Sequence, residues 1–180
     1  MKTLPLEKAL TFIEPGPLTL VTTFDGKKPN VMTISWTAAL DFNQHILLVT
    51  GPWNYSFDAL LKTKECVVCL PGPALLKKAV QVGMISGETE DKFKKLRIKT
   101  YPAKKVKAPL LAGCVACLEC RVTDYIKQYG FVILQVMEVW HNERCRDKRL
   151  VHAVGDGTFT ADGEHFNLRA LMKEKLPPGL

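Results

Sequence analysis

The chain of 180 residues is long enough for one sizeable hydrophobic core and too short for two ordinary domains, so a single domain is predicted over residues 1–180. Hydrophobic residues make up 47% of the sequence and charged residues 24%, and the apolar runs are short. This excludes a disordered chain and a membrane-spanning helix. The formal charge is +7, but the basic residues are scattered and carry no nucleic-acid-binding signature, so we expect solvated faces and an anion-attracting cleft.

The first residues of the sequence bear on whether the protein is secreted or stays in the cytoplasm. Pro5, Glu7 and Lys8 interrupt what would have to be a continuous apolar segment in a secretion signal. We therefore expect a cytoplasmic protein with no membrane association. In a reducing compartment the six cysteines are expected to be thiols and not disulfides.

The first half of the chain alternates predicted strands with short helices. Residues 17–24 are rich in β-branched side chains, Asp25-Gly26 is typical of a hairpin turn, and residues 30–36 form the returning strand. Ser56 is expected to be the N-cap of the helix that follows it. The predicted elements are a helix over residues 6–12, strands over residues 17–24, 30–36, 45–50 and 65–70, and helices over residues 57–62 and 73–84.

The second half is almost purely strand. Its predicted elements are a helix over residues 90–96, strands over residues 106–111, 114–126 and 131–140, a turn over 127–130, a loop over 155–159, a turn at 162–163 and a helix over 166–173. Sequential strands with short inserted helices predict a mainly β fold, closed as an antiparallel barrel, because an open sheet leaves edges to protect. A doubly wound α/β fold fits less well because strands and helices do not alternate regularly.

Motifs of the common enzyme classes are absent. The sequence has no nucleophile elbow, no phosphate-binding loop and no glycine fingerprint for a dinucleotide. The four histidines, at positions 45, 141, 152 and 165, are too separated for a helical metal pair. No catalytic side chain and no metal ligand is predicted.

Cysteines at spacing three form the most metal-like pattern, Cys114-Val-Ala-Cys117-Leu-Glu-Cys120. The run is apolar, lacks glycine and continues into a strand, where residues three apart point to opposite faces. We therefore interpret these cysteines as small buried hydrophobic residues, and apply the same interpretation to Cys66 and Cys69. A metal-binding thiol protein stays an alternative.

Three short polar loops interrupt the strands, at residues 30–36, 52–56 and 86–93. Each joins hydroxyl or amide groups to an aromatic or apolar neighbour, as a flat heterocycle with a sugar-like chain and a phosphate requires. Asp91 is expected to cap a helix, and Lys92, next to Ser86 and Thr89, is a candidate partner for a phosphate. The alternative for Lys92, a solvated helix lysine, stays open.

Taken in order, four motifs resemble the flavin reductase-like, FMN-binding split-barrel proteins, and flavoredoxins most closely. They are Asn30-x-Met-Thr-x-Ser-Trp36, Asn54-Tyr-Ser56, Ser86-Gly87 followed by Asp91-Lys-Phe93, and the Cys-x-x-Cys-Leu-Glu-Cys-Arg-Val strand. The resemblance implies a six-stranded antiparallel Greek-key split barrel, a homodimer and one bound FMN per subunit. It also implies redox work with an acidic electron carrier or with NAD(P)H.

The resemblance also implies where FMN would bind. The segment 30–36 would wrap the isoalloxazine and ribityl chain, and Phe159 would lie by the ring. The second and third loops, with Thr50, would approach the phosphate. The implied cofactor-binding residues are Asn30, Met32, Thr33, Ile34, Ser35, Trp36, Thr50, Asn54, Tyr55, Ser56, Ser86, Lys92 and Phe159.

Two positions depart from the family pattern. Relatives often carry an arginine where this chain has Asn54, and a histidine where it has Tyr129. Phosphate binding is then expected to move onto Lys92 and neighbouring lysines. A purely structural interpretation also stays open, in which Met32, Ile34 and Trp36 are core residues on alternate strand positions.

The function predicted from the sequence is electron transfer by an FMN-binding flavoprotein. In this interpretation the cofactor carries the redox step, and the protein orients and tunes it. An NAD(P)H-dependent flavin reductase is the first alternative. A basic nucleic-acid-binding module is a more distant one, which a strongly salt-dependent oligonucleotide affinity would favour.

Overall fold

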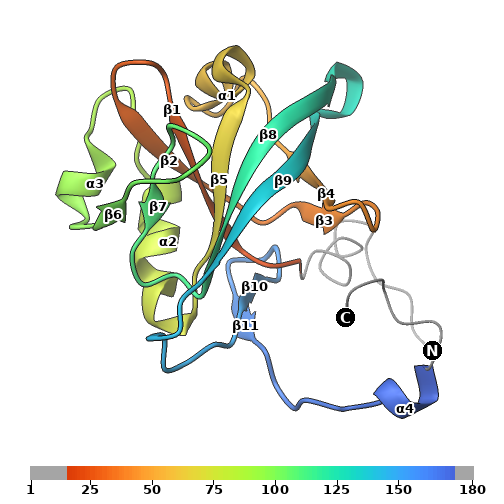
Figure 1. Cartoon of the computed structure of the whole chain (residues 1–180). Helices are drawn as coiled ribbons and strands as arrows, with labels where there is room; N and C mark the ends of the chain where they lie inside the picture. The colour runs from red at the N-terminus through yellow and green to blue at the C-terminus, as the bar shows by residue number, and fades with distance from the viewer. Residues whose placement is uncertain (1–15, 173–180) are drawn as a thin grey trace, which may run out of the picture.

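The computed structural model describes residues 16–172, which form mainly antiparallel β-sheet with a few short helices (Figure 1). The main sheet has seven strands in the order β2-β1-β5-β8-β9-β4-β3. Its strands are β1 (Thr19–Phe24), β2 (Pro29–Ile34), β3 (Thr37–Ala39), β4 (His45–Val49), β5 (Glu65–Leu70), β8 (Ala116–Ile126) and β9 (Phe131–His141). The mainly β prediction is confirmed, but the predicted count of six strands is wrong, because the short β3 pairs with β4 and adds a seventh.

The sheet is curled into a half-barrel by the short connection between its two edge strands. β2 and β3 lie at opposite ends of the strand order, yet only Ser35 and Trp36 separate them in the chain. Three Cα–Cα steps cover at most about 11 Å, whereas six strand spacings in a flat sheet would put the edges about 29 Å apart. The edges must therefore approach each other, and β8 and β9 bend with the curl, with two register irregularities between them.

Hydrophobic residues fill both faces of this sheet. The inner cluster joins strands from both halves of the curl, including Val21, Leu48 and Val132, and α1 (Phe57–Thr63) closes it with Phe57 and Leu60. The outer cluster covers the other face and includes Ala79 and Val82 of α2. Its buried members are Leu18, Leu20, Val31, Val67, Cys69, Ala79, Val82, Val106, Ala108, Leu110, Leu111, Cys114, Cys117 and Val151. Nearly every residue of β1 and β5 is buried, because both of their faces are covered.

The helices are short and lie at the margins of the sheet. They are α1, η3 (Pro73–Leu75), α2 (Leu76–Gly83), α3 (Lys92–Lys95), η4 (Lys127–Tyr129) and α4 (Arg169–Met172). The predicted helix over 57–62 is confirmed, and the one over 73–84 is a 3-10 turn followed by α2. The helices predicted over 90–96 and 166–173 are shorter in the structure, and the helix predicted over 6–12 lies outside the described residues. No helix within residues 16–172 is long and apolar enough to cross a bilayer.

Both predicted hairpins are confirmed, with β1 paired to β2 and β8 to β9. At the first turn, the Asp25 carboxylate accepts hydrogen bonds from the backbone of Lys27 and Lys28, and Gly26 takes a positive φ of 100°. Elsewhere two predictions are wrong. Residues 106–111 form a strand only at β7 (Leu110–Leu111), which pairs with β6 (Thr100–Tyr101), and the expected loop over 155–159 ends in β11 (Phe159–Ala161), which pairs with β10 (Val151–Ala153).

A buried carboxylate explains why the chain before β7 is not a strand. Glu119 of β8 is fully buried, and its oxygens accept hydrogen bonds from the backbone of Lys104, Lys105 and Val106 and from the Trp140 indole at 2.6 Å. Burial pushes the pKa of Glu119 upward, but these donors outweigh it and hold the pKa below the ordinary value. The backbone donors of 104–106 are thus satisfied by a side chain and need no neighbouring strand.

Replacing this carboxylate should destabilise the fold. In Glu119→Gln one acceptor oxygen becomes an amide donor, so we expect the free energy of unfolding at pH 7 to fall by about 2 kcal/mol in urea titrations. Glu138→Gln is the matched control. Glu138 lies opposite Glu119 in the register and pairs with the exposed Lys104, so its loss should cost less than about 1 kcal/mol.

The pH dependence of stability follows from the direction in which folding shifts the pKa of Glu119. Because folding lowers the pKa of Glu119, its stabilisation is complete at neutral pH and is lost as the pH falls below about 4.5, the ordinary glutamate value. The gap in stability between wild type and Glu119→Gln should narrow over that range. Equal stability of the two proteins at pH 7 would show that this carboxylate does not hold the 104–106 segment.

Candidate functional site

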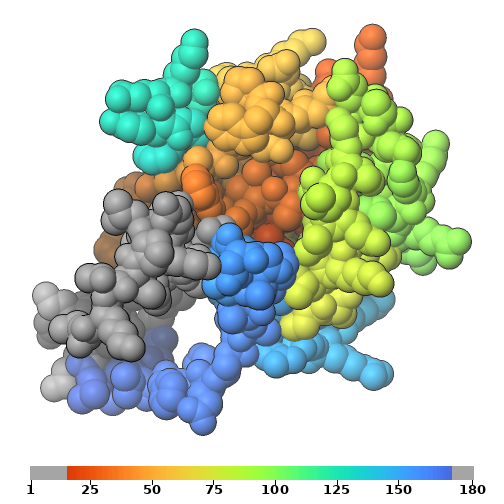
Figure 2. Space-filling model, turned by 180° about the vertical axis from the view of Figure 1, so that it is seen from behind, coloured from red at the N-terminus to blue at the C-terminus, as the bar shows by residue number. Residues whose placement is uncertain are grey.

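A polar cleft lies where the β1–β2 hairpin meets the segment before α1 and the segment after α2. Figure 2 shows the hollow, with the orange-red strands at its floor between the gold 50–60 region and the lime-green 80s. It consists of two adjoining cavities of about 470 and 270 Å³. The residues that line both cavities, which define the polar cleft, are Asn30, Trp53, Asn54, Tyr55, Ser56 and Ser86.

One glycine allows the segment after α2 to come this close to β2, and a second lies under a ring within the segment before α1. A Cβ on Gly87 would overlap the Asn30 amide, and a Cβ on Gly51 would overlap the Trp53 ring. A larger residue at position 87 would displace the buried Asn30 amide from its place against Ser56, whereas one at position 51 would turn the exposed Trp53 ring. The cleft therefore depends on the close approach of backbone to side chain at Gly87.

Hydrogen bonds between amides and hydroxyls hold the cleft in shape. The Asn30 amide donates to the Ser56 hydroxyl at 2.8 Å, and both side chains are buried. The Asn54 amide donates to the Thr50 hydroxyl at 3.1 Å. Ser56 occupies the N-cap position of α1 as predicted, but its side chain makes no cap hydrogen bond. The Ser56 hydroxyl instead accepts from Asn30, and the Ser56 backbone is already helical (φ −72°, ψ −9°), so Ser56 is the N-cap by position without a cap hydrogen bond.

Lys92 is the most unusual residue near the cleft. Only 6% of its surface is exposed, and its ammonium donates to the carbonyls of Val31 and Val82, both at 2.9 Å. It therefore ties β2 to α2 and is not the solvated helix lysine that the sequence left open. Burial lowers its pKa to about 8. Its ammonium has a third N–H, and Lys92 lines the smaller cavity of the cleft.

Asp91, next to Lys92, begins α3 as a capping residue. Its carboxylate accepts from the backbone of Lys94 at 3.1 Å, as predicted, and this hydrogen bond lowers its pKa. The cap fixes the turn that carries Lys92 inward.

Sequence reasoning missed eight residues that line the larger cavity, namely Thr23, Asp25, Lys28, Pro52, Trp53, Asp58, Ala59 and Glu88. The Lys28 ammonium donates to the Gly87 carbonyl at 3.2 Å and lies 5.5 Å from the centre of the Tyr55 ring. Thr23 is fully buried, and its hydroxyl has no hydrogen-bond partner among the residues that the structure describes. Trp53 is 71% exposed. Trp53 falls inside a loop that the sequence had singled out, whereas nothing local distinguishes Thr23 and Lys28 from other residues of a hairpin.

The structure brings together most, but not all, of the predicted site residues. Those that line the cleft are Asn30, Met32, Thr33, Asn54, Tyr55, Ser56, Ser86 and Lys92. Thr50 lies behind Asn54, and Ile34 packs in the inner cluster. Ser35 and Trp36 form the link between β2 and β3, where the Trp36 carbonyl accepts from Val49 at 3.0 Å. Phe159 packs against the outer cluster, away from the residues that line the cleft.

The cysteines divide between the two faces of the sheet. Cys66 and Cys120 are register partners in the inner cluster, and Cys69 and Cys117 are register partners in the outer one. The prediction that residues three apart diverge is confirmed for Cys117 and Cys120. It is wrong for Cys114, because this residue precedes β8 and joins Cys117 on the same face.

Comparison with known proteins identifies the family. The flavin reductase-like domain matches residues 13–158, so the chain belongs to the flavin reductase-like family. The resemblance expected from the sequence motifs is therefore confirmed.

Individual relatives agree with this assignment. An uncharacterized protein of Archaeoglobus fulgidus is 32% identical over 146 residues, which cover 76% of this chain and 82% of that protein. The flavoredoxin of Desulfovibrio vulgaris (Miyazaki F) superposes with a TM-score of 0.84 at 25% identity, covering 93% of this chain and 96% of that chain. An FMN-binding domain of a flavin reductase-like enzyme from Shewanella baltica superposes with a TM-score of 0.77 at 26% identity, covering 92% of this chain and 96% of that chain.

The buried Lys92 should make stability depend on alkaline pH. Its pKa is about 8 when folded and 10.5 in an ordinary lysine, so between these values the unfolded chain binds the proton more readily. Stability from this group therefore rises with pH. Relative to Lys92→Met, the wild type should gain about 2 kcal/mol of unfolding free energy between pH 7 and pH 10 in urea titrations. Parallel pH profiles of the two proteins would contradict the burial of this charge.

Proposed function

We propose that this chain binds FMN in the polar cleft and works in electron transfer as a flavoredoxin-like protein. The observation that carries the proposal is the buried Thr23 hydroxyl, which has no partner within residues 16–172; Thr23 lines the larger cavity. A buried polar group costs free energy unless it is hydrogen-bonded, so this hydroxyl indicates a ligand with polar atoms. The family membership supports the choice of a flavin.

The size and chemistry of the cleft fit this ligand. The larger cavity, of about 470 Å³, falls within the usual range for cofactor-sized sites. Hydroxyl-bearing Tyr55, Ser56 and Ser86 and the lysines Lys28 and Lys92 line the two cavities, and the acidic residues Asp25, Asp58 and Glu88 line only the larger one. Hydroxyl and ammonium donors of this kind are what a phosphate recruits.

The residues of the site divide into two groups in this proposal. Toward the phosphate we place Thr50, Asn54, Tyr55, Ser56, Ser86 and Lys92, to which the structure adds Lys28. Toward the ring and ribityl chain we place Asn30, Met32 and Thr33, with Ser35 and Trp36 of the adjoining link. Ile34 and Phe159, which pack in the inner cluster and against the outer cluster, are left out of the proposed site. Bound FMN supplies the redox chemistry, and these residues hold it and limit the access of water.

The net charge and the exposed aromatic side chains bear on which partners the protein binds. The formal charge of +7 suits an acidic electron-carrier protein. Trp36, Phe42 and Trp53 are 49%, 68% and 71% exposed, and exposed aromatics of this kind support a homodimer. The alternative role, an NAD(P)H-dependent flavin reductase with flavin as a loosely held substrate, is supported by the family to which the chain belongs.

Flavin retention tests the proposal directly. The purified protein, incubated with FMN and passed through gel filtration, should keep about one FMN per chain, with the double absorption band of a flavin, and should elute at the volume of a dimer. Loss of FMN on the column with turnover of NADH or NADPH would favour the reductase instead. Failure of the protein to bind FMN that is supplied in excess would contradict the proposed function.

A lysine substitution tests the phosphate end of the cleft. Lys28→Met should lower the affinity for FMN at least about tenfold and the affinity for riboflavin far less, because only FMN carries the phosphate. Lys27→Met is the matched control: Lys27 is the neighbouring exposed lysine, does not line the cleft, and should leave both affinities unchanged. Flavin fluorescence quenching measures the affinities. Equal weakening of FMN and riboflavin by Lys28→Met would contradict the phosphate contact.

A further inference from the structure

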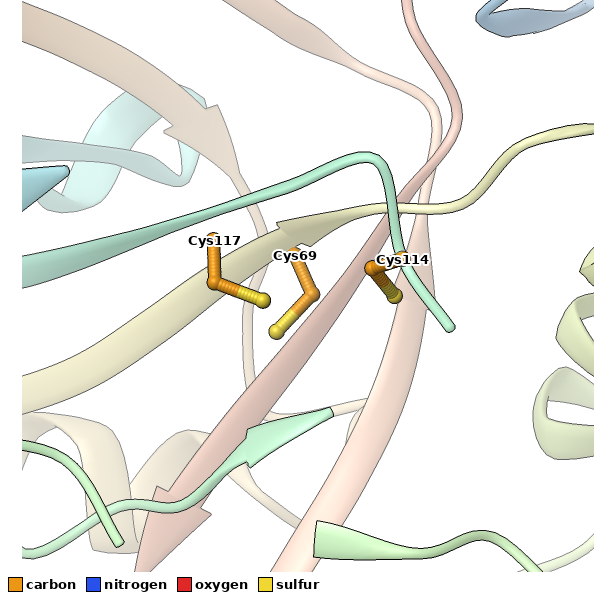
Figure 3. Close-up of side chains that lie close together, drawn as sticks. All are labelled: Cys69, Cys114 and Cys117. Carbon is orange, nitrogen blue, oxygen red and sulfur yellow. The ribbon is translucent and has the colours of Figure 1, made fainter. Parts of the chain in front are cut away.

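Three thiols converge at one point on the outer face of the sheet. Cys69 of β5, Cys117 of β8 and Cys114 of the loop before β8 have sulfur atoms within 4.8 Å of one another (Figure 3). All three side chains are buried, with exposures of 0%, 5% and 2%. Among the described residues, no fourth sulfur, imidazole nitrogen or carboxylate oxygen lies within 4.8 Å of all three sulfurs, and we call the three cysteines the thiol triad.

The backbone around the triad is fixed by hydrogen bonds and by one glycine. Cys69 and Cys117 face each other across the β5–β8 pair. Gly113 takes a φ of 83°, a conformation that suits glycine, and turns the chain so that Cys114 points to the same side. The Asn142 amide then holds the Cys114 carbonyl at 3.0 Å, and the backbone of Asn142 holds Val115 at 2.9 Å. The thiols are therefore placed before any ligand arrives.

We propose that the thiol triad is a three-coordinate binding site for a soft monovalent metal ion, Cu(I). Metal–sulfur bonds of about 2.3 Å in a plane put the sulfurs about 4 Å apart, which agrees with the observed spacing. Thiolate ligands select soft ions. Zn²⁺ takes four ligands in structural sites, whereas Cu(I) is satisfied by the three sulfurs that the triad supplies.

The second cysteine pair shows what distinguishes the triad from ordinary core cysteines. Cys66 and Cys120 are equally buried register partners in the same two strands. They have no third thiol, and their cluster is the apolar barrel interior. They therefore provide an internal control with matched burial and strand position.

The triad also has an entrance. Cys114 and Cys117 line a cavity of about 320 Å³, and Trp140, His141 and Arg144 line it with them. An incoming ion replaces the thiol protons, which leave to solvent, and no electron is transferred. The resulting three thiolates and one Cu(I) carry a net charge of minus two, and Arg144 is a cationic residue in the lining of the same cavity.

This inference goes beyond the proposed flavin function and does not depend on it. The residues of the polar cleft and those of the thiol triad are different, and the cavities beside them share no lining residue. A failure to bind flavin would therefore not contradict the proposed metal site, and a failure to bind metal would not contradict the proposed flavin site.

Competition for Cu(I) tests the site. The full-length chain, reduced and kept without oxygen, is titrated with Cu(I) held by a coloured Cu(I) chelator, once with FMN and once without. We expect one Cu(I) per chain in both cases. Affinity should fall at least about 100-fold in Cys69→Ala, Cys114→Ala and Cys117→Ala, and should not change in Cys66→Ala or Cys120→Ala. No uptake by the wild type, or an equal loss in the Cys66 and Cys120 variants, would overturn the proposal.

X-ray absorption on the copper-loaded wild type gives an answer even where a variant fails to fold. Three sulfur neighbours at one distance are expected. Two sulfur neighbours, as the Cys66–Cys120 pair would provide, would overturn the assignment. So would tighter binding of Zn²⁺ than of Cu(I) in parallel titrations, because that preference requires a fourth ligand.

Discussion

The short link between β2 and β3 is the constraint on which the rest of this structure depends. Two residues join the opposite edges of a seven-stranded sheet, and a flat sheet cannot satisfy that connection. Curling creates an interior that α1 closes with Phe57 and Leu60. It also leaves β1 and β5 covered on both faces, since the outer face is packed under α2 and the segment before β8. The half-barrel and its two cores are thus one consequence of chain connectivity.

The polar cleft uses the same architecture at the start of β2. Asn30 and Lys92 join this strand to the segments on either side, the first through Ser56 and the second through the carbonyls of Val31 and Val82. A buried ammonium loses solvation, and two carbonyl acceptors offset part of that cost. The close contact between Gly87 and the Asn30 amide leaves little room for these two walls to shift. The cleft is therefore largely preformed, which lowers the entropy cost of binding a ligand.

Local patterns in the sequence were sufficient for most elements and insufficient for contacts between them. Alternation and turn residues located the β1–β2 and β8–β9 hairpins, and the polar loops indicated most residues of the cleft. Lys28 and Thr23 could not be found in this way, because they join the cleft only when α1 and the 83–88 segment pack against their hairpin. Glu119 lies in an ordinary strand sequence, and its backbone partners are 13 to 15 residues away in the chain. Such contacts are decided by tertiary packing, which no local period records.

The cysteines show how strongly the register of two strands decides chemistry. In β5 and β8, alternation sends Cys66 and Cys120 into the barrel and Cys69 and Cys117 out of it. Because the period of a strand is two residues, a slip of one residue would reverse both assignments. The register is held at both ends, where Val122 donates to the Lys64 carbonyl at 2.9 Å and Val115 to the Leu70 carbonyl at 2.8 Å. The second of these bonds also positions the residue next to Cys114, so the contact that fixes the strand pairing is the one that brings the third sulfur to the other two.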